Sequence, residues 1–528
     1  MAEAWYEQQL RLRQQMERWI HREMKNQEGE PWHGGHDEGT FAASWIEYYR
    51  MTRDEGVLDF LTDIQDSFLD WADENFVDGY WPEQEAHHGP EAFMIFLARM
   101  WHLNPDDGRL VEAFEDAAEH IGNWADDVPD WYDWDNHRFV SWSLGTEVVA
   151  EDEADNYNVA DHFKVAQIAL VTYLATGKDR YLEVVQDFAD RWVEKILDGE
   201  TIPAAFVPVD DRDEVEDTYR EGLVEDLDLD TEDALERHAA AGSMDTLMDL
   251  YELTGEDRYA ETVAVMLEAM LGQVADAYAD PAAPLFWRYR MITGVRQFDK
   301  DLQKALSVPR IYEDYFMMFD DQPAAHPMGL GRRKDAPKWG YWGPEATLEL
   351  TNGPSPAALM LLYQITEDET AATRAFQLAA TRLELALDAG LNSGRHHGCS
   401  GNTINAIAFG HGRSAGAGYA MTTLYPATIG NRRFVNGEKP LLQYWNEDDE
   451  PGLPEEIEAL CRRASLDEAS VTLASTSFQP TTVIVGPARE DQELTISAGG
   501  RQLQQDDSGR THIQLPLGQE YGVDITIE

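Results

Sequence analysis

Cysteine is nearly absent from this sequence, which contains only Cys399 and Cys461 in 528 residues. Two cysteines exclude a disulfide framework and a zinc site built from several thiolates. Cys399 in particular has no cysteine neighbour with which to share a metal ion. The low cysteine content is typical of a protein that works in a reducing compartment.

Long apolar runs are also missing. No stretch approaches the roughly 20 consecutive apolar residues that cross a membrane. The amphipathic N-terminal segment, residues 1–24, carries charges throughout instead of the apolar centre of a secretory signal. We therefore predict a cytoplasmic protein, which restricts it to small or imported substrates.

Basic residues are scarce: the sequence contains 41 Lys and Arg and 100 Asp and Glu, which gives a formal net charge of −59. This charge repels nucleic acids and anionic membranes, so we expect neither as a partner and leave the oligomeric state open. The 16 Trp, 21 Tyr and 19 Phe indicate a packed core rather than a disordered chain. Because the acids are spread along the whole chain, we predict the salt-screened surface of a halophile's protein.

What the sequence does contain is a repeat. An apolar helix, a short turn of the T-G-x-D-R-Y kind and an amphipathic helix follow one another in each unit. The first helix is apolar nearly all round, as an inner helix is, and the second has one apolar face, as an outer helix has. The units are residues 45–72, 94–124, 168–193, 246–271 and 358–387.

The segments that precede the inner helices are rich in His, Asn and Gly, and we interpret them as rim loops, for example residues 156–164, 236–244 and 394–403. An open solenoid does not need such residues at one end of every unit, whereas a closed ring would bring them together on one rim. After about residue 455 the pattern alternates with a period of two. We predict a mainly α protein, an (α/α)6 or (α/α)7 toroid over residues 1–455 with a small antiparallel β domain over residues 456–528.

This pattern resembles the (α/α) toroids of carbohydrate-active enzymes, and it is most similar to the polysaccharide lyases of pectate lyase family 2. Members of that family cleave galacturonides and hold a divalent metal with two His and one Glu. The resemblance implies His120, Glu147 and His162 as ligands of a Mn, Ca or Zn ion, in the family's His, Glu, His order. Asp161 precedes His162 where an Arg would match, so the family's Arg base is not carried over.

Elimination from a uronate needs a base for the proton α to the carboxylate and a cation to neutralise that carboxylate. Lys164, Arg138 and Tyr157 are the candidate catalytic residues. The structural alternative is that Asn158 or Asp161 caps the following helix and His162 packs beside it. A second candidate metal cluster is His88 with Glu91, spaced i and i+3.

Aromatic residues in the loop 127–139 suit the apolar faces of sugar rings, although they also suit a plug over one end of the ring. Arg288 and Arg290 are predicted to hold a uronate carboxylate, or else to be ordinary surface or packing arginines. The predicted substrate-binding residues are Trp131, Tyr132, Trp134, Asn158, His238, Arg288, Arg290, His397 and Asn402.

We therefore predict a carbon–oxygen lyase that cleaves uronic-acid-containing, pectate-type oligo- or polysaccharides by metal-assisted β-elimination. The alternative is a glycoside hydrolase of the unsaturated-uronyl, six-hairpin type, with Asp133 or Asp135 as the acid. A third hypothesis is a non-catalytic helical-repeat protein that binds carbohydrate, which the titratable residues in the rim loops disfavour.

Overall fold

The structure is a computed structural model of the chain. It describes residues 4–26, 43–82, 84–86, 89–126, 130–140, 143–146, 149, 158–199, 201–206, 231–272, 274, 282–307, 315–319, 327–332, 346–347, 354–388, 431–434, 437–440, 442–466, 468–488, 493–516 and 520–527.

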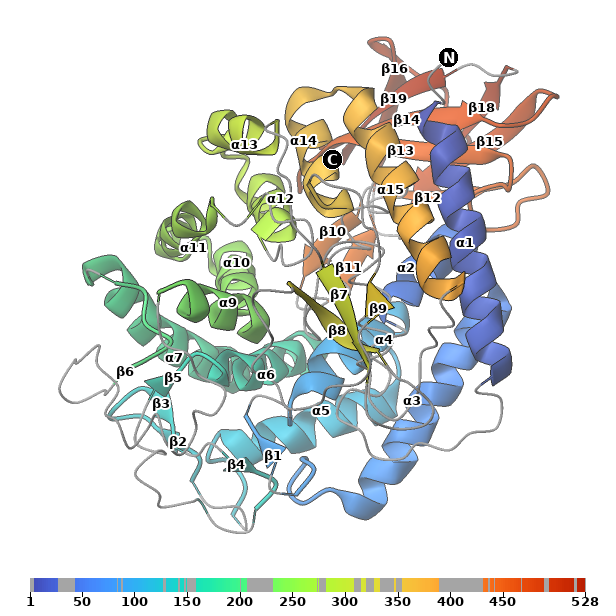
Figure 1. Cartoon of the computed structure of the whole chain (residues 1–528). Coiled ribbons are helices and arrows are strands. Elements are labelled where there is room, and N and C mark those ends of the chain that lie inside the picture. The colour runs from blue at the N-terminus through green and yellow to red at the C-terminus, as the bar shows by residue number, and fades with distance from the viewer. Residues whose placement is uncertain are drawn as a thin grey trace.

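Helical hairpins follow one another around a ring, which Figure 1 shows with its inner and outer layers. The inner helices are α2 (Ala43–Thr52), the π-helix η2 (Ala92–Leu97) continued by α4 (Ala98–Leu103), α6 (His162–Thr176), α10 (Ser243–Thr254), α12 (Ala282–Thr293) and α14 (Pro356–Thr366). The outer helices are α3 (Glu55–Asn75), α5 (Gly108–Ile121), α7 (Asp179–Asp198), α11 (Asp257–Met270), α13 (Asp299–Leu306) and α15 (Glu369–Asp388). The mainly α prediction is confirmed, whereas the number of hairpins in the full toroid stays a prediction.

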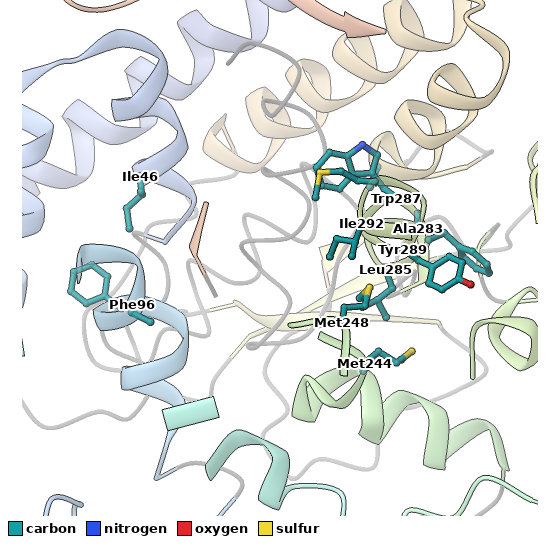
Figure 2. Packing of buried hydrophobic residues seen from close by; sticks show 14 of the residues in the cluster. Ile46, Phe96, Met244, Met248, Ala283, Leu285, Trp287, Tyr289 and Ile292 are labelled. Atoms are coloured by element: carbon teal, nitrogen blue, oxygen red, sulfur yellow. The ribbon is translucent and has the colours of Figure 1, made fainter. Parts of the chain in front are cut away.

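The predicted inner and outer helices differ in burial as their sequences indicate. Every residue of α6 from His162 to Thr172 is buried, whereas α7 buries one face and exposes the other. Figure 2 shows how apolar side chains of neighbouring inner helices face each other, for example Ile46 beside Phe96. The ring is therefore held by a continuous apolar layer between its two rows of helices.

The repeated turn has a local cause. Gly177 and Gly255 end α6 and α10 in the left-handed conformation, with φ values of 70° and 73°. Their N–H groups donate to the carbonyls of Tyr173 and Tyr251, which is a common way to end a helix. Glu367 adopts the same conformation after α14, with a φ of 55°, where the sequence has no glycine.

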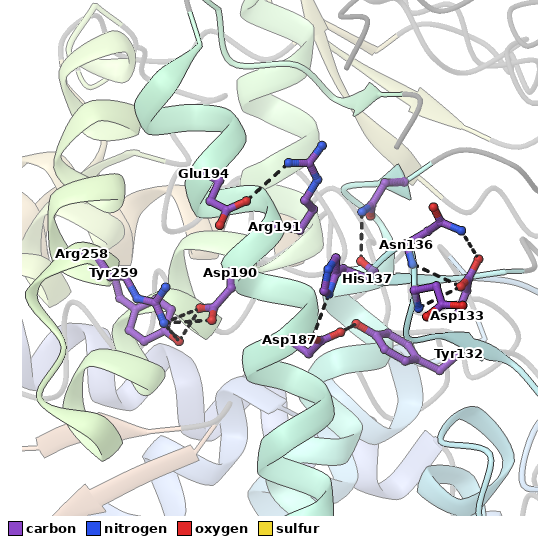
Figure 3. A network of polar contacts seen from close by, with 12 residues as sticks. Tyr132, Asp133, Asn136, His137, Asp187, Asp190, Arg191, Glu194, Arg258 and Tyr259 are labelled. Atoms are coloured by element: carbon purple, nitrogen blue, oxygen red, sulfur yellow. Dashed lines mark hydrogen bonds and ion pairs between the residues drawn. The ribbon is translucent and has the colours of Figure 1, made fainter. Parts of the chain in front are cut away.

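The Arg-Tyr pair of the repeat joins each outer helix to the one before it. The Tyr259 hydroxyl donates to Asp190 of α7 at 2.8 Å, and Arg258 forms an ion pair with the same carboxylate at 2.8 Å. Figure 3 shows this arrangement. In the preceding repeat, Arg180 and Tyr181 contact Glu119 of α5 in the same way. The repeat motif thus encodes a clamp between outer helices as well as a turn.

Helix α1 (Trp5–Asn26) lies against α15 and thereby joins the end of the helical chain to its beginning (Figure 1). Arg11 forms an ion pair with Glu384 of α15 at 2.6 Å, and Trp19 packs edge-on against Trp45 of α2. On another face, Arg13 forms an ion pair with buried Glu458 of the β domain at 2.6 Å. One helix therefore contacts both ends of the ring and the C-terminal domain.

The C-terminal residues form two antiparallel sheets. The first contains β12 (Leu442–Trp445), β15 (Thr481–Pro487) and β18 (Thr511–Leu515), and the second contains β13 (Ile457–Ala464), β14 (Glu468–Ser475), β19 (Glu520–Ile527), β16 (Leu494–Ala498) and β17 (Arg501–Gln502). Strand β12 precedes residue 456, the predicted start of the β domain, yet it pairs with β15.

Short strands occur in the connections of the ring. They are β1 (Gln84–Glu85) with β4 (Ser143–Leu144), β2 (Tyr132–Asp133) with β3 (Arg138–Phe139), β5 (Asn158–Val159) with β6 (Ala205–Phe206), β7 (Tyr315–Phe319) with β8 (Pro327–Arg332) and β9 (Ala346–Thr347), and β10 (Asn431–Phe434) with β11 (Gly437–Pro440). Within the described part of the chain, no helix has the length and apolar character needed to span a membrane.

Candidate functional site

The inner helices all begin at one end of the ring, because each hairpin returns the chain to the same side. We call this end the rim. It was predicted to gather polar residues, and the described part of it contains buried charges. Glu91 precedes η2, Asp161 precedes α6, Lys164 lies in the first turn of α6, and Arg237 lies in α9 (Thr231–Ala241), which leads into α10.

These four side chains form a row across three hairpins. The Lys164 ammonium lies 2.7 Å from a Glu91 carboxylate oxygen, and both side chains are fully buried. Arg237 Nε donates to Asp161 Oδ2 at 2.6 Å. Asp161 and Lys164 are three residues apart at the start of α6, which places them on neighbouring positions of one turn. We call Glu91, Lys164, Asp161 and Arg237 the rim charge row.

Burial makes this row energetically unusual. Removing two charges from water costs several kcal/mol for each ion, and the cost is recovered only where the partners are well placed. Paired buried charges of this kind add little net stability, and ionisable groups in such surroundings are concentrated at functional sites. The row is therefore the strongest candidate for chemistry in the described rim.

The predicted histidines of the rim are packed into the interior. His162 lies among aromatic rings, 5.4 Å from the Phe139 centroid and 6.5 Å from that of Phe188. His238 makes 2.9 Å hydrogen bonds with the Ser243 hydroxyl and the Pro203 carbonyl. Burial lowers the pKa of His238 to about 4, so its ring is neutral at pH 7.

The tautomer of His238 follows from these partners. A carbonyl oxygen only accepts, so Nε2 carries the hydrogen, and Nδ1 accepts from the Ser243 hydroxyl. Asn158 is similarly engaged, because its Oδ1 accepts from Trp192 and its Nδ2 donates to the His137 carbonyl at 3.2 Å. His238 and Asn158, both predicted to bind substrate, thus connect loop segments to helices by hydrogen bonds within the protein.

The aromatic loop folds as the β2–β3 hairpin against α7 (Figure 3). Trp131 and Tyr132 are buried, whereas Trp134 remains 42% exposed. The Tyr132 hydroxyl donates to Asp187 of α7 at 2.6 Å, and burial followed by this carboxylate raises the Tyr132 pKa. Of the three aromatic residues, Trp134 is the one that offers its ring to solvent.

The acids predicted for a hydrolase lie in the same hairpin. Asp133 accepts hydrogen bonds from the Asp135 backbone at 3.1 Å and the Asn136 side chain at 2.7 Å. Arg138, a predicted base, lies 3.6 Å from Asp133. Asp133 therefore shapes its own turn, and Asp135 is exposed at the tip of the hairpin.

His120, a predicted metal ligand, is buried between Trp131 at 4.5 Å and Tyr80 at 5.3 Å. Its Nδ1 lies 3.8 Å from Asp78, and burial lowers the His120 pKa to about 4. Among the described residues, no three His, Cys, Asp or Glu side chains are placed to hold a metal ion. Glu147 lies outside the described residues, so the metal set stays an untested prediction.

The arginines predicted to hold a uronate are paired with carboxylates of the protein. Arg288 of α12 bonds to Asp245 and Asp249 of α10. Arg290 bonds to Asp299 and donates to the Gln364 carbonyl at 3.1 Å. Their observed contacts match the packing alternative. Four further predicted site residues lie outside the described part of the chain: His88, Tyr157, His397 and Asn402.

Sequence reasoning did not single out Arg237, of the rim charge row, or Asp187, which contacts the β2–β3 hairpin. Arg237 stands in a segment interpreted as a rim loop, residues 236–244, which is instead helical up to Ala241. The run of three alanines there was a helix signal. Asp187 lies on a predicted outer helix, and its contact with the hairpin had no local signal.

No protein-family model and no curated protein matches the sequence. Solved structures similar to the chain include one titled glycoside hydrolase, at 10% identity and a TM-score of 0.33, covering 94% of this chain and 76% of the other. A GH127 β-arabinofuranosidase has 11% identity and a TM-score of 0.30, with coverages of 93% and 78%. Endoglucanase CelQ from Clostridium thermocellum, complexed with cellotriose, has 13% identity and a TM-score of 0.30, with coverages of 86% and 85%. Likeness at this level transfers neither an active site nor a substrate.

The prediction of a uronate lyase is corrected by these neighbours, which are named as enzymes of glycoside hydrolysis rather than elimination. Lys164 was predicted to act as a base, but its ammonium group is buried in an ion pair with Glu91. In the structure this amine contacts a protein carboxylate, and the role of Lys164 as a base stays a prediction.

Proposed function

We propose that this protein is a glycoside hydrolase that acts at the rim of its helical ring, with Glu91 and Asp161 as its pair of carboxyl groups. One observation carries the proposal: neighbouring inner helices place two buried acids at the same end of the ring, each held by a cation. Hydrolysis of a glycoside generally uses two carboxyl groups, one to protonate the leaving oxygen and the other as nucleophile or base.

The cations have a definite part in this proposal. Lys164 and Arg237 each hold one oxygen of a carboxylate, which limits the rotation of that side chain. Fixed carboxyl groups lower the cost of reaching the reactive geometry. Lys164 and Arg237 are therefore positioning residues.

The substrate is proposed to be a glycan. Because Arg288 and Arg290 are bonded to protein carboxylates, the described residues support an unsaturated-uronyl substrate less than the sequence alone did. Trial substrates should include neutral glycosides beside uronides. We also propose that the enzyme works at high salt, since a net charge of −59 is strongly self-repulsive at low ionic strength.

The test is an assay at high KCl with neutral and acidic oligosaccharides, in which new reducing ends and the ultraviolet absorbance of an unsaturated product are followed together. We expect reducing ends without absorbance. Glu91→Gln and Asp161→Asn should each lower turnover by a factor of at least about 10³, which is about 4 kcal/mol of barrier.

Asp73→Asn is the matched control, because Asp73 lies on α3 and its side chain is 76% exposed. Circular dichroism and thermal unfolding of each variant separate lost chemistry from lost folding. Turnover that survives both rim substitutions would refute the assignment of the carboxyl pair. No reducing ends from any substrate would refute the hydrolase.

A further inference from the structure

We infer that the tip of the β2–β3 hairpin is a second glycan-binding site, which takes a neutral sugar ring with Trp134 as platform and His137 as hydrogen-bond acceptor. The inference rests on the proposed function, because it takes the substrate to be a glycan. The tip comprises residues 134–137 and lies outside the rim charge row.

Hydrogen bonds fix the base of the β2–β3 hairpin. Asn123 binds the Tyr132 backbone twice: its Oδ1 accepts from the N–H at 2.7 Å and its Nδ2 donates to the carbonyl at 2.5 Å. The Val140 N–H donates to the Trp131 carbonyl at 2.9 Å. A tip fixed in this way loses little conformational entropy when it binds a ligand.

Trp134 is supported but not covered. Its ring lies 4.8 Å from that of Tyr132 at an interplanar angle of 72°, and 42% of the residue is exposed. The Tyr132 hydroxyl in turn bonds to Asp187, so the platform is anchored to α7. An anchored indole in solvent offers a large apolar surface with few degrees of freedom, as binding sites do.

His137 is held in an uncommon conformation that leaves its outer nitrogen available. Its φ is 55°, which is rare for a residue other than glycine. Asn158 Nδ2 donates to the His137 carbonyl at 3.2 Å. The His137 Nδ1 lies 2.9 Å from an Asp187 carboxylate oxygen, as Figure 3 shows. Because a carboxylate only accepts, Nδ1 carries the hydrogen, and in that tautomer Nε2 is an acceptor. The side chain is 45% exposed, so this acceptor reaches solvent.

The chemistry of the tip selects a neutral, hydroxylated ring. Its polar side chains include two acceptors, His137 Nε2 and the exposed Asp135 carboxylate, and hydroxyl groups donate to both. Nearby cations are paired, since Arg138 lies 3.6 Å from Asp133 and Arg191 lies 3.4 Å from Glu194. An anionic sugar would meet acceptors and a negative field, whereas a neutral sugar offers an apolar face and hydroxyl donors.

The experiment measures retention of the full-length protein in KCl on beads carrying xylan, arabinan or β-glucan, with polygalacturonate beads as the acidic comparison. We expect retention on at least one neutral glycan, and a loss of at least tenfold in Trp134→Ala. Phe478→Ala is the matched control, because Phe478 is an aromatic residue of the β domain that is 92% exposed. His137→Gly, which removes the imidazole without disfavouring the backbone conformation, should also weaken retention.

Equal retention of the wild type and Trp134→Ala, retention on polygalacturonate alone, or no retention on any bead would each overturn the inference. Failure of the proposed function appears differently, as a wild type that hydrolyses no glycoside.

Discussion

The inner and outer layers of the ring use ion pairs in opposite ways. In the inner layer the pairs are fully buried and join neighbouring hairpins, as Lys164 does with Glu91. In the outer layer the pairs are partly exposed, as Arg258 is with Asp190, whose side chains are 37% and 32% exposed. Ion pairs connect neighbouring helices in both layers, but the paired side chains are shielded from solvent in the inner layer and partly exposed to it in the outer layer.

This difference separates the roles of the two layers. An exposed ion pair contributes at most about 1 kcal/mol to the free energy of unfolding and is weakened by salt. The outer pairs therefore align neighbouring helices at little energetic cost. In a buried ion pair, the cost of removing the charges from water offsets much of their Coulombic attraction. Apolar residues of the same volume often replace such a pair without loss of stability. The outer pairs therefore have a sufficient structural explanation, whereas the rim charge row calls for a functional one.

The largest effect is expected from Lys164→Met, which removes the cation from beside a buried carboxylate. We expect a loss of about 3–5 kcal/mol in the free energy of unfolding, measured with urea, because the Glu91 charge stays buried. The double variant Lys164→Met with Glu91→Leu should recover most of it. A loss below about 1 kcal/mol in the free energy of unfolding would show that the inner pair is as accessible to solvent as an outer one.

A buried pair outside the rim sharpens the comparison. Burial raises the pKa of Glu458 to about 7 from its ordinary 4.5, with Arg13 opposing the shift. The folded state thus binds the proton more tightly, so the contribution of Glu458 to stability falls as pH rises from about 4.5 to 7 and then levels. The fall is about 3 kcal/mol in size.

Glu458→Gln should flatten this part of the stability curve relative to the wild type, measured by urea unfolding between pH 4 and 8. Glu456→Gln, on an exposed neighbour in sequence, should leave the curve unchanged. Parallel curves for the wild type and Glu458→Gln would contradict the expected burial of this carboxylate.

The smallest effect is expected from Arg258→Ala in the outer layer. We expect a loss of about 0.2–1 kcal/mol, greater at low than at high KCl, because the pair is screened by salt. Thermal unfolding at two salt concentrations measures it, with Arg501→Ala, an exposed arginine of the β domain, as the control. A large loss that does not change with salt would place this clamp with the inner pairs.

Much of the fold could be predicted, because the spacing of apolar residues along the sequence indicates which side chains are buried. The largely apolar helix α6, the amphipathic helix α7 and the glycine turn at Gly177 could each be predicted from a few neighbouring residues. The site was much less predictable. Lys164 was identified as a candidate, yet as a base instead of a paired cation, since no local pattern names the partner of a charge.

Local periodicity was sufficient to establish alternating helices, the repeated turn and a β-rich C-terminal region, because each depends on residues a few positions apart. The pairing of Lys164 with Glu91, 73 residues away, and of Arg237 with Asp161, 76 residues away, arises when hairpins pack side by side. The same packing buries Tyr132 and leaves Trp134 in solvent, although both are aromatic residues of one hairpin. A sequence pattern specifies which side chains avoid water, and only the packing of distant elements specifies which of them meet.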